Sequence, residues 1–114
     1  AGDFYWAYKT KSGKAIWITA DCTGHGVPGA FMSMIGNSLL NEIVIEKGIE
    51  EPNEVLNRLR DGVIKSIGQS GEANKIKDGM DAALCCWDKT SNNVSFSGAN
   101  NSLWVIRKDE FIDL

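Results

Sequence analysis

Residues 15–30 read AIWITADCTGHGVPGA, and the fold of the chain is decided by this stretch. Its first six residues form an apolar run typical of a strand, and Pro28 stands where a long amphipathic helix would begin. Between them lie the carboxylate of Asp21 and a glycine-rich turn. Glycine lets the backbone approach a ligand closely, a helix start offers free N–H groups to an anion, and carboxylates suit Mg²⁺ or Mn²⁺. The stretch therefore predicts a strand–turn–helix site for a metal ion and a phosphate group.

A second carboxylate, Asp3, stands just before another strand-like run, Phe4–Lys9. The residues KSGK at 11–14 are typical of a turn that joins this run to the strand at 15–20. In such a hairpin Asp3 begins one strand and Asp21 ends its neighbour. We therefore expect both carboxylates at the same end of a sheet, where they could share metal ions.

The rest of the chain alternates helical and strand-like patterns. Apolar spacing predicts one helix from Pro28 to Lys47, stopped by Gly48, and a second from Pro52 to Gly68, packed as an antiparallel pair. Three strands are predicted after them, at 80–87, 94–98 and 103–107, joined by a polar loop at 69–79, a turn at 88–93 and a connection at 98–102. This order predicts an α+β fold with an antiparallel β-sheet, flanked on one face by the helix pair.

Composition excludes several classes of function. The 114 residues carry a net charge of -3, which disfavours a nucleic-acid partner, and no apolar run approaches the roughly 20 residues of a membrane span, so we expect no membrane contact from this segment. Three cysteines do not make a disulfide framework, and one histidine disfavours a zinc site. Cys85 and Cys86 are expected to be free thiols on opposite faces of a buried strand.

Three motifs, GDFY at 2–5, D-x-x-GHGVP at 21–28 and SGANN at 97–101, occur in an order that resembles the stage II sporulation protein E-type phosphatases. These are bacterial members of the metal-dependent type 2C serine/threonine phosphatases, whose fold is a β-sandwich flanked by helices. The family carries a further Asp-Gly metal motif and a last acidic ligand, neither of which appears before Leu114. We therefore expect residues 1–114 to be a single partial phosphatase domain, incomplete at both ends.

The resemblance implies a set of metal ligands. Asp21 would bridge two Mn²⁺ or Mg²⁺ ions, Asp3 would bind directly or through water, and the backbone carbonyl of Cys22 would be a further ligand. Most of the class has glycine where Cys22 stands. Taken without the resemblance, Asp21 reads equally well as a turn or helix-cap aspartate, and Asp3 as a solvated charge at the end of a strand.

Other residues near these motifs keep more than one reading. Gly24 and Gly26 are expected to let the loop turn beside the metals and the phosphate. His25 is either a general acid for the leaving serine oxygen or a residue that orients the loop. Asp81 is either a hydrogen-bond partner of the metal-bearing loop or a charge at the end of a strand. The four tryptophans, Trp6, Trp17, Trp87 and Trp104, are expected in the core.

The resemblance implies a metal-dependent phosphatase that hydrolyses phosphoserine or phosphothreonine on a regulatory protein of anti-anti-sigma factor type, by means of a metal-bound hydroxide. It also implies an upstream sensory or regulatory domain and a bacterial cytoplasmic location, with any membrane tether lying outside this segment. The alternative is a non-catalytic module that binds a phosphoprotein, because the late ligands are missing. A nucleotide site is disfavoured, since the turn lacks both the Lys-Ser/Thr of a P-loop and the Gly-x-Gly-x-x-Gly pattern.

Overall fold

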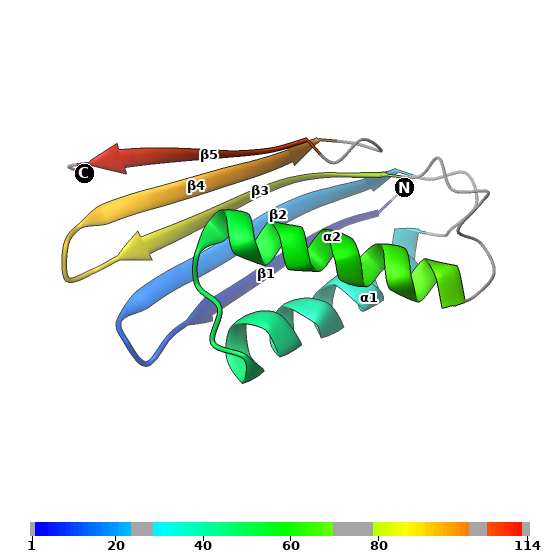
Figure 1. Cartoon of the computed structure of the whole chain (residues 1–114), viewed down its shortest axis with the longest axis horizontal. Coiled ribbons are helices and arrows are strands. Elements are labelled where there is room, and N and C mark those ends of the chain that lie inside the picture. Colours follow the sequence, from blue (N-terminus) through cyan, green and yellow to red (C-terminus); the bar gives the residue numbers. More distant parts are fainter. Residues whose placement is uncertain (1, 24–28, 70–78, 101–104, 113–114) are drawn as a thin grey trace.

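The computed structural model describes residues 2–23, 29–69, 79–100 and 105–112, and within them the side chains of residues 4–21, 30–66 and 81–98. Five strands form one antiparallel sheet in the order β1-β2-β3-β4-β5, with both α-helices on one of its faces (Figure 1). The elements are β1 Gly2–Lys9, β2 Lys14–Thr23, α1 Gly29–Leu40, the π-helix η1 Asn41–Glu46, α2 Pro52–Gln69, β3 Gly79–Asp88, β4 Asn93–Asn100 and β5 Val105–Ile112. The expected α+β fold is confirmed.

Two tight turns connect neighbouring strands at the same end of the sheet. In the β1–β2 turn, Gly13 has a φ of +92°, a conformation that only glycine adopts without strain, and its N–H donates to the carbonyl oxygen of Thr10 over 3.1 Å. In the β3–β4 turn, the N–H of Thr90 donates to Asp88 Oδ1 over 3.0 Å, and Asn92 has a φ of 59°. Both turns fall where the sequence predicts them.

The helices are inserted between two strands that pair with each other. β2 and β3 are antiparallel partners over their whole length, from Lys14↔Asp88 to Thr23↔Gly79, although α1, η1 and α2 separate them in the sequence. This pairing between segments distant in the chain brings the start of β3 beside the end of β2. The position of the candidate site depends on it.

The helical region differs in one respect from the single helix predicted at 28–47. The α-helix ends at Leu40 and continues as a π-helix to Glu46, while Pro28 lies outside the described residues. Gly48, with a φ of +70°, follows the helical segment, and Pro52 begins α2 as predicted. Figure 1 shows α1 and α2 running in opposite directions across the sheet, as expected for the antiparallel pair.

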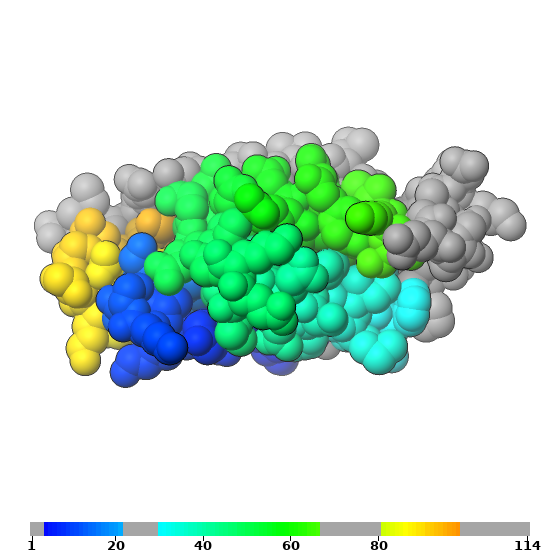
Figure 2. All heavy atoms as spheres, turned by 60° about the horizontal axis from the view of Figure 1, so that its bottom comes forward, coloured from blue at the N-terminus to red at the C-terminus, as the bar shows by residue number. Residues whose placement is uncertain are grey.

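One face of the sheet, which we call the covered face, packs against the helices. Alternate strand residues point to it, as the two-residue period of a strand requires. Phe4, Ile18 and Leu84 are buried there. The remaining core residues are Trp6, Ile16, Ala20, Met32, Leu40, Ile43, Val44, Val55, Leu56, Leu59, Val63, Ala82 and Cys86. In the space-filling view, α1, η1 and α2 form one continuous layer over this face (Figure 2).

The intervening strand residues point to the opposite side, which we call the open face. Tyr5 is 75% exposed there and Trp17 is 39% exposed, and Trp87 is half-buried. The expectation that the tryptophans are core residues is therefore correct for Trp6 and wrong for Trp17, because Trp17 alternates with the buried Ile16 and Ile18. Trp104 lies outside the described residues.

Several strands extend further than their apolar runs. β2 continues to Thr23 and β4 to Asn100, while β5 starts at Val105 and runs to Ile112. Backbone pairing with a neighbour continues through polar residues, which hydrophobic patterns do not register. The predicted loop at 69–79 lies for the most part outside the described residues. None of the helices in the described ranges has the length and apolarity needed to cross a lipid bilayer.

Candidate metal centre

Three aspartates lie in one row across three neighbouring strands. In the β1–β2 pair, Asp3 is the Cα partner of Asp21, and in the β2–β3 pair Asp21 is the partner of Asp81. Adjacent strands lie about 4.8 Å apart, and directly opposite residues point to the same face. The expectation that Asp3 and Asp21 share one end of the sheet is confirmed. Asp21 is a strand residue paired on both sides, and β2 continues two residues beyond it, to Thr23.

The row belongs to the open face. Asp21 and Asp81 are both exposed, and they alternate with Ala20 and Ala82, which are buried beneath the helices. The backbone register puts Asp3 in the same row; its side chain is outside the described set. Asp21 and Asp81 are therefore accessible to solvent. A small ion or a substrate phosphate that binds here would have to reach them from the same side.

The donor chemistry of the row fits a divalent cation. Carboxylate oxygens are the ligands that Mg²⁺ and Mn²⁺ prefer, and like charges directly opposite in a sheet repel each other unless a cation lies between them. Among the described side chains, no group of three or more His, Cys, Asp or Glu is gathered closely enough to hold a metal. Only two members of the row, Asp21 and Asp81, fall within that set. Asp3 joins them through the backbone register.

Cys22 follows Asp21 directly in the chain, so its backbone lies beside this row. It lies within β2, with Gly2 and Met80 as Cα partners. In the described part of the chain, Asn92 is the one residue other than glycine with positive φ, so Cys22 has an ordinary strand conformation that tolerates a side chain. Its replacement of the glycine found in most of the class needs no backbone strain. Gly24, His25 and Gly26 lie outside the described residues, and their expected roles remain predictions.

Helix α1 rests directly on β1 near the row. A Cβ placed on Gly36 would lie 2.6 Å from Phe4 Cζ, so the helix approaches the ring as closely as only glycine allows. Two residues further along β1, Trp6 Nε1 donates a hydrogen bond to Asn41 Oδ1 over 3.0 Å. These contacts hold β1 and therefore position Asp3 next to Phe4. The sequence does not indicate these contacts, because Gly36 is simply a non-apolar position within the apolar spacing of the helix.

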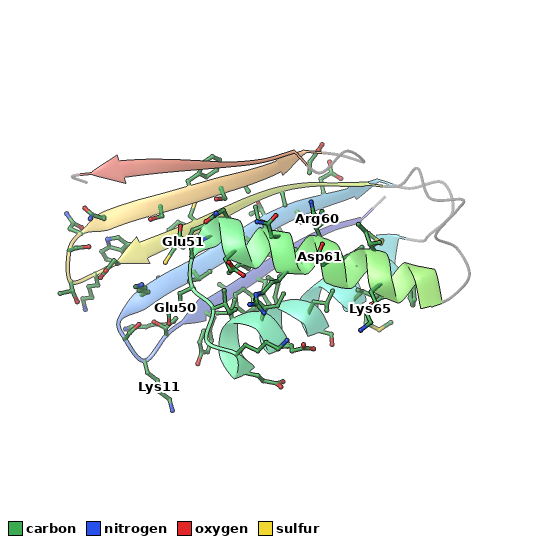
Figure 3. The ribbon with its side chains drawn as sticks, in the orientation of Figure 1. Lys11, Glu50, Glu51, Arg60, Asp61 and Lys65 are labelled. Carbon is green, nitrogen blue, oxygen red and sulfur yellow. The ribbon has the colours of Figure 1, made fainter. Side chains whose placement is uncertain are left out.

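A second polar cluster lies at the opposite end of β2 from Asp21. Lys14 Nζ is 3.3 Å from Glu50 Oε1, and Ser12 Oγ donates to the same carboxylate. Figure 3 labels Glu50, in the segment before α2, and Lys11, in the β1–β2 turn. Burial alone would lower the pKa of Lys14, but the hydrogen bond and charge of Glu50 outweigh it and raise the pKa. The cluster ties the β1–β2 turn to the segment before α2, far from the aspartate row. It stabilises the fold at this end of the sheet.

The two adjacent cysteines are free and inert. Cys86 is buried on the covered face and Cys85 is half-buried on the open face, as predicted. Burial raises the pKa of Cys86 to about 11, with a smaller opposing influence from Lys14, and burial also raises the pKa of Cys85. Both thiols are protonated at neutral pH. Neither has the thiolate character that a nucleophile needs.

Comparison with known proteins identifies the family. The sequence model of stage II sporulation protein E (SpoIIE) matches residues 11–112, nearly the whole chain. The chain belongs to the SpoIIE family. This confirms the resemblance, and the matched range contains the D-x-x-GHGVP and SGANN motifs, while GDFY lies before it. No curated protein sequence matches this SpoIIE-family chain.

Solved structures share the fold. The SiaA-PP2C domain of Pseudomonas aeruginosa is 23% identical, with a TM-score of 0.77, over 99% of this chain and 51% of that one. A stage II sporulation E family protein from Thermanaerovibrio acidaminovorans is 14% identical, with a TM-score of 0.69, over 85% of this chain and 45% of that one. The SpoIIE-family chain thus spans about half the length of these two structures, and at such identities the likeness establishes the type 2C phosphatase fold.

Proposed function

We propose that the protein is a metal-dependent serine/threonine phosphatase that hydrolyses phosphoserine or phosphothreonine on a regulatory protein. The observation that carries the proposal is the direct pairing of Asp3 with Asp21 in a SpoIIE-family chain. The two motifs that supply these aspartates are separated by the β1–β2 turn. The sheet nevertheless brings them to neighbouring positions on its open face.

Each site residue has a defined task in this proposal. Asp21, flanked by carboxylates on both sides, would bridge two Mn²⁺ or Mg²⁺ ions; Asp3 would bind one of them, directly or through water. The Cys22 carbonyl would be a further ligand. The ions, when bound, supply Lewis acidity and lower the pKa of a coordinated water. Water oxygen attacks phosphorus in line, the bond from phosphorus to the serine oxygen breaks, and that oxygen leaves with a proton.

Residues 24–28 join Thr23, at the end of β2, to Gly29, at the start of α1. We assign the substrate phosphate to this loop because glycine permits close backbone approach and oriented N–H groups neutralise phosphoryl oxygens. His25 is proposed either to protonate the leaving oxygen or to orient the loop. We further propose a phosphorylated substrate of anti-anti-sigma factor type, an upstream sensory or regulatory domain and a bacterial cytoplasmic location.

The test is hydrolysis of an aryl phosphate by the full-length protein in Mn²⁺, compared with Asp21→Asn. We expect Asp21→Asn to lower the rate of hydrolysis by more than about 100-fold. Removing a residue that only supports a metal ligand through a hydrogen bond already lowers activity by up to about 100-fold. Asp61→Asn, which changes an exposed aspartate on α2, is the matched control and should keep full activity (Figure 3). A wild-type protein inert with Mg²⁺ and Mn²⁺ would favour the alternative, a non-catalytic module that binds phosphoproteins.

Peptides distinguish the substrate class. Release of phosphate from phosphoserine and phosphothreonine peptides, with little from phosphotyrosine peptides, is the expected result. Equal rates on all three would contradict serine/threonine specificity while leaving the metal-dependent hydrolysis intact.

A further inference from the structure

Asp81 occupies a place that its sequence position does not reveal. It lies far along the chain from Asp3 and Asp21, beyond both helices, yet β3 pairs with β2 so that Asp81 stands directly opposite Asp21. Asp3 stands opposite Asp21 on the other side. The central aspartate of the proposed metal centre therefore has a carboxylate-bearing residue on each flank.

The register that produces this row is fixed by the core. In the same ladder, Ile18 pairs with Leu84, and both are buried under the helices. A slip of one residue would turn Leu84 to the open face and expose it, so the pairing of Asp21 with Asp81 is specified by hydrophobic burial several residues away. The ladder also continues beyond the pair, through Cys22↔Met80 to Thr23↔Gly79. Paired residues before and after Asp81 in β3 therefore hold it beside Asp21.

The charge arrangement of the row also favours a cation. Like charges directly opposite on neighbouring strands destabilise the pair, and here the aspartates belong to adjacent strands on one face. A divalent cation held between the carboxylates would offset this repulsion.

The spacing suits shared coordination. Side chains opposite each other in an antiparallel pair have Cβ atoms about 5 Å apart. Ligand oxygens about 2.1 Å from one Mg²⁺ ion lie roughly 3–4 Å from each other, a separation that two such aspartates can reach. We propose that Asp81 is a third carboxylate ligand of the divalent metal centre, on the side of Asp21 away from Asp3. This inference rests on the proposed function and adds a residue that the family's motifs do not include.

The test is a calorimetric Mn²⁺ titration of the full-length protein and of three variants, Asp81→Asn, Asp21→Asn and Asp61→Asn. Asparagine keeps the size and an oxygen acceptor, so it preserves a structural hydrogen bond and removes only the charge and the strong metal ligand. We expect the Kd for Mn²⁺ to rise about tenfold or more in Asp81→Asn. Asp61→Asn should bind as wild type does, and Asp21→Asn should lose most of the affinity.

Thermal unfolding with and without Mn²⁺ gives a second readout. In EDTA we expect Asp81→Asn to be at least as stable as wild type, because a like-charge contact is removed; in Mn²⁺ its gain in Tm should be smaller. Asp81→Ser, which shortens the side chain, should behave in the same way. Variants that melt earlier in EDTA yet gain as much Tm from Mn²⁺ as wild type would make Asp81 a structural residue and overturn the inference.

The outcomes separate the two proposals. Unchanged Mn²⁺ affinity in Asp81→Asn, together with lost affinity in Asp21→Asn, overturns the role of Asp81 and leaves the proposed phosphatase standing. Absence of Mn²⁺ and Mg²⁺ binding by the wild-type protein overturns both.

Discussion

The two faces of this sheet are formed by the same strands but have different roles. On the covered face, Ile18 and Leu84 are buried against the helices. On the open face, Trp17, one residue from Ile18, is substantially exposed, and Asp21 further along the same strand is solvent-accessible. The alternation of a strand makes this division possible, because neighbouring residues in sequence lie on opposite sides. Stability resides mainly on the covered face, and the candidate chemistry lies on the open one. Substitutions should therefore separate the two properties.

The sharpest test of this division is Leu84→Ala. Leu84 is fully buried between Ile18 and Ser97 in the ladder, so the truncation leaves a cavity and should lower the free energy of unfolding by about 2–5 kcal/mol. Thr19→Ala, on the open face of the adjacent strand, should cost about 0.5 kcal/mol. Urea unfolding of both variants measures the difference. Equal losses would show that the open face carries as much of the stability as the covered face.

The contact between α1 and the covered face can be tested at Gly36. A Cβ at this position would clash with the ring of buried Phe4, so Gly36→Ala should destabilise the protein by roughly 1–3 kcal/mol, despite the better helix propensity of alanine.

Gly62→Ala is the matched control for Gly36→Ala. Its Cβ would meet the side-chain end of Leu39, which is half-buried and can move, so we expect a change close to zero. Thermal unfolding of both variants decides the point. If Gly62→Ala lowers the stability as much as Gly36→Ala does, the loss in Gly36→Ala does not come from the close contact between α1 and β1.

Ser97 is a polar exception on the covered face. Its side chain is fully buried, and Oγ has no hydrogen-bond partner among the described atoms. Removing an unsatisfied hydroxyl relieves a desolvation penalty, so Ser97→Ala should raise the free energy of unfolding by about 1 kcal/mol. Ser95→Ala, at a half-buried position of the same strand, should change it by less than about 0.5 kcal/mol. A loss of stability in Ser97→Ala would reveal a hydrogen bond that the hydroxyl makes.

The smallest expected effect concerns the ion pair at the end of β2 opposite to the aspartate row. Lys14→Met should cost about 0.5 kcal/mol at pH 7, because both partners are partly exposed and solvent screens the pair. The pKa of Lys14 is raised in the folded state above its ordinary value of 10.5, so the stabilisation is fully present below that pH and lost as the pH rises through the folded pKa. Lys11→Met, at an exposed position in the same turn, is the control. A difference in stability between the two variants that persists at a pH well above the folded pKa of Lys14 would exclude the ion pair as its source.

Much of the architecture was predictable from local patterns. Glycines and polar residues marked both hairpin turns, helical spacing marked α1 and α2, and strand-like runs marked β1 and β2. Hydrophobic patterns were less informative at the ends of strands. β2, for example, continues through Asp21 to Thr23 because β1 and β3 pair with it. The change from α-helix to π-helix at Asn41 also left no mark in the hydrophobic spacing. The prediction that Trp17 is buried was wrong, because large aromatic residues are buried on average but not at every position.

The sequence by itself determined the family, the α+β class and the position of Asp3 and Asp21 at the same end of the sheet. Each follows from short motifs, local periodicity or a hairpin turn, and all of these act between residues close in the chain. Only the tertiary structure decided which strand lies on the other side of Asp21, and with it the place of Asp81. That pairing joins segments separated by two helices, and its register is fixed by burial of residues such as Ile18 and Leu84 rather than by any local signal.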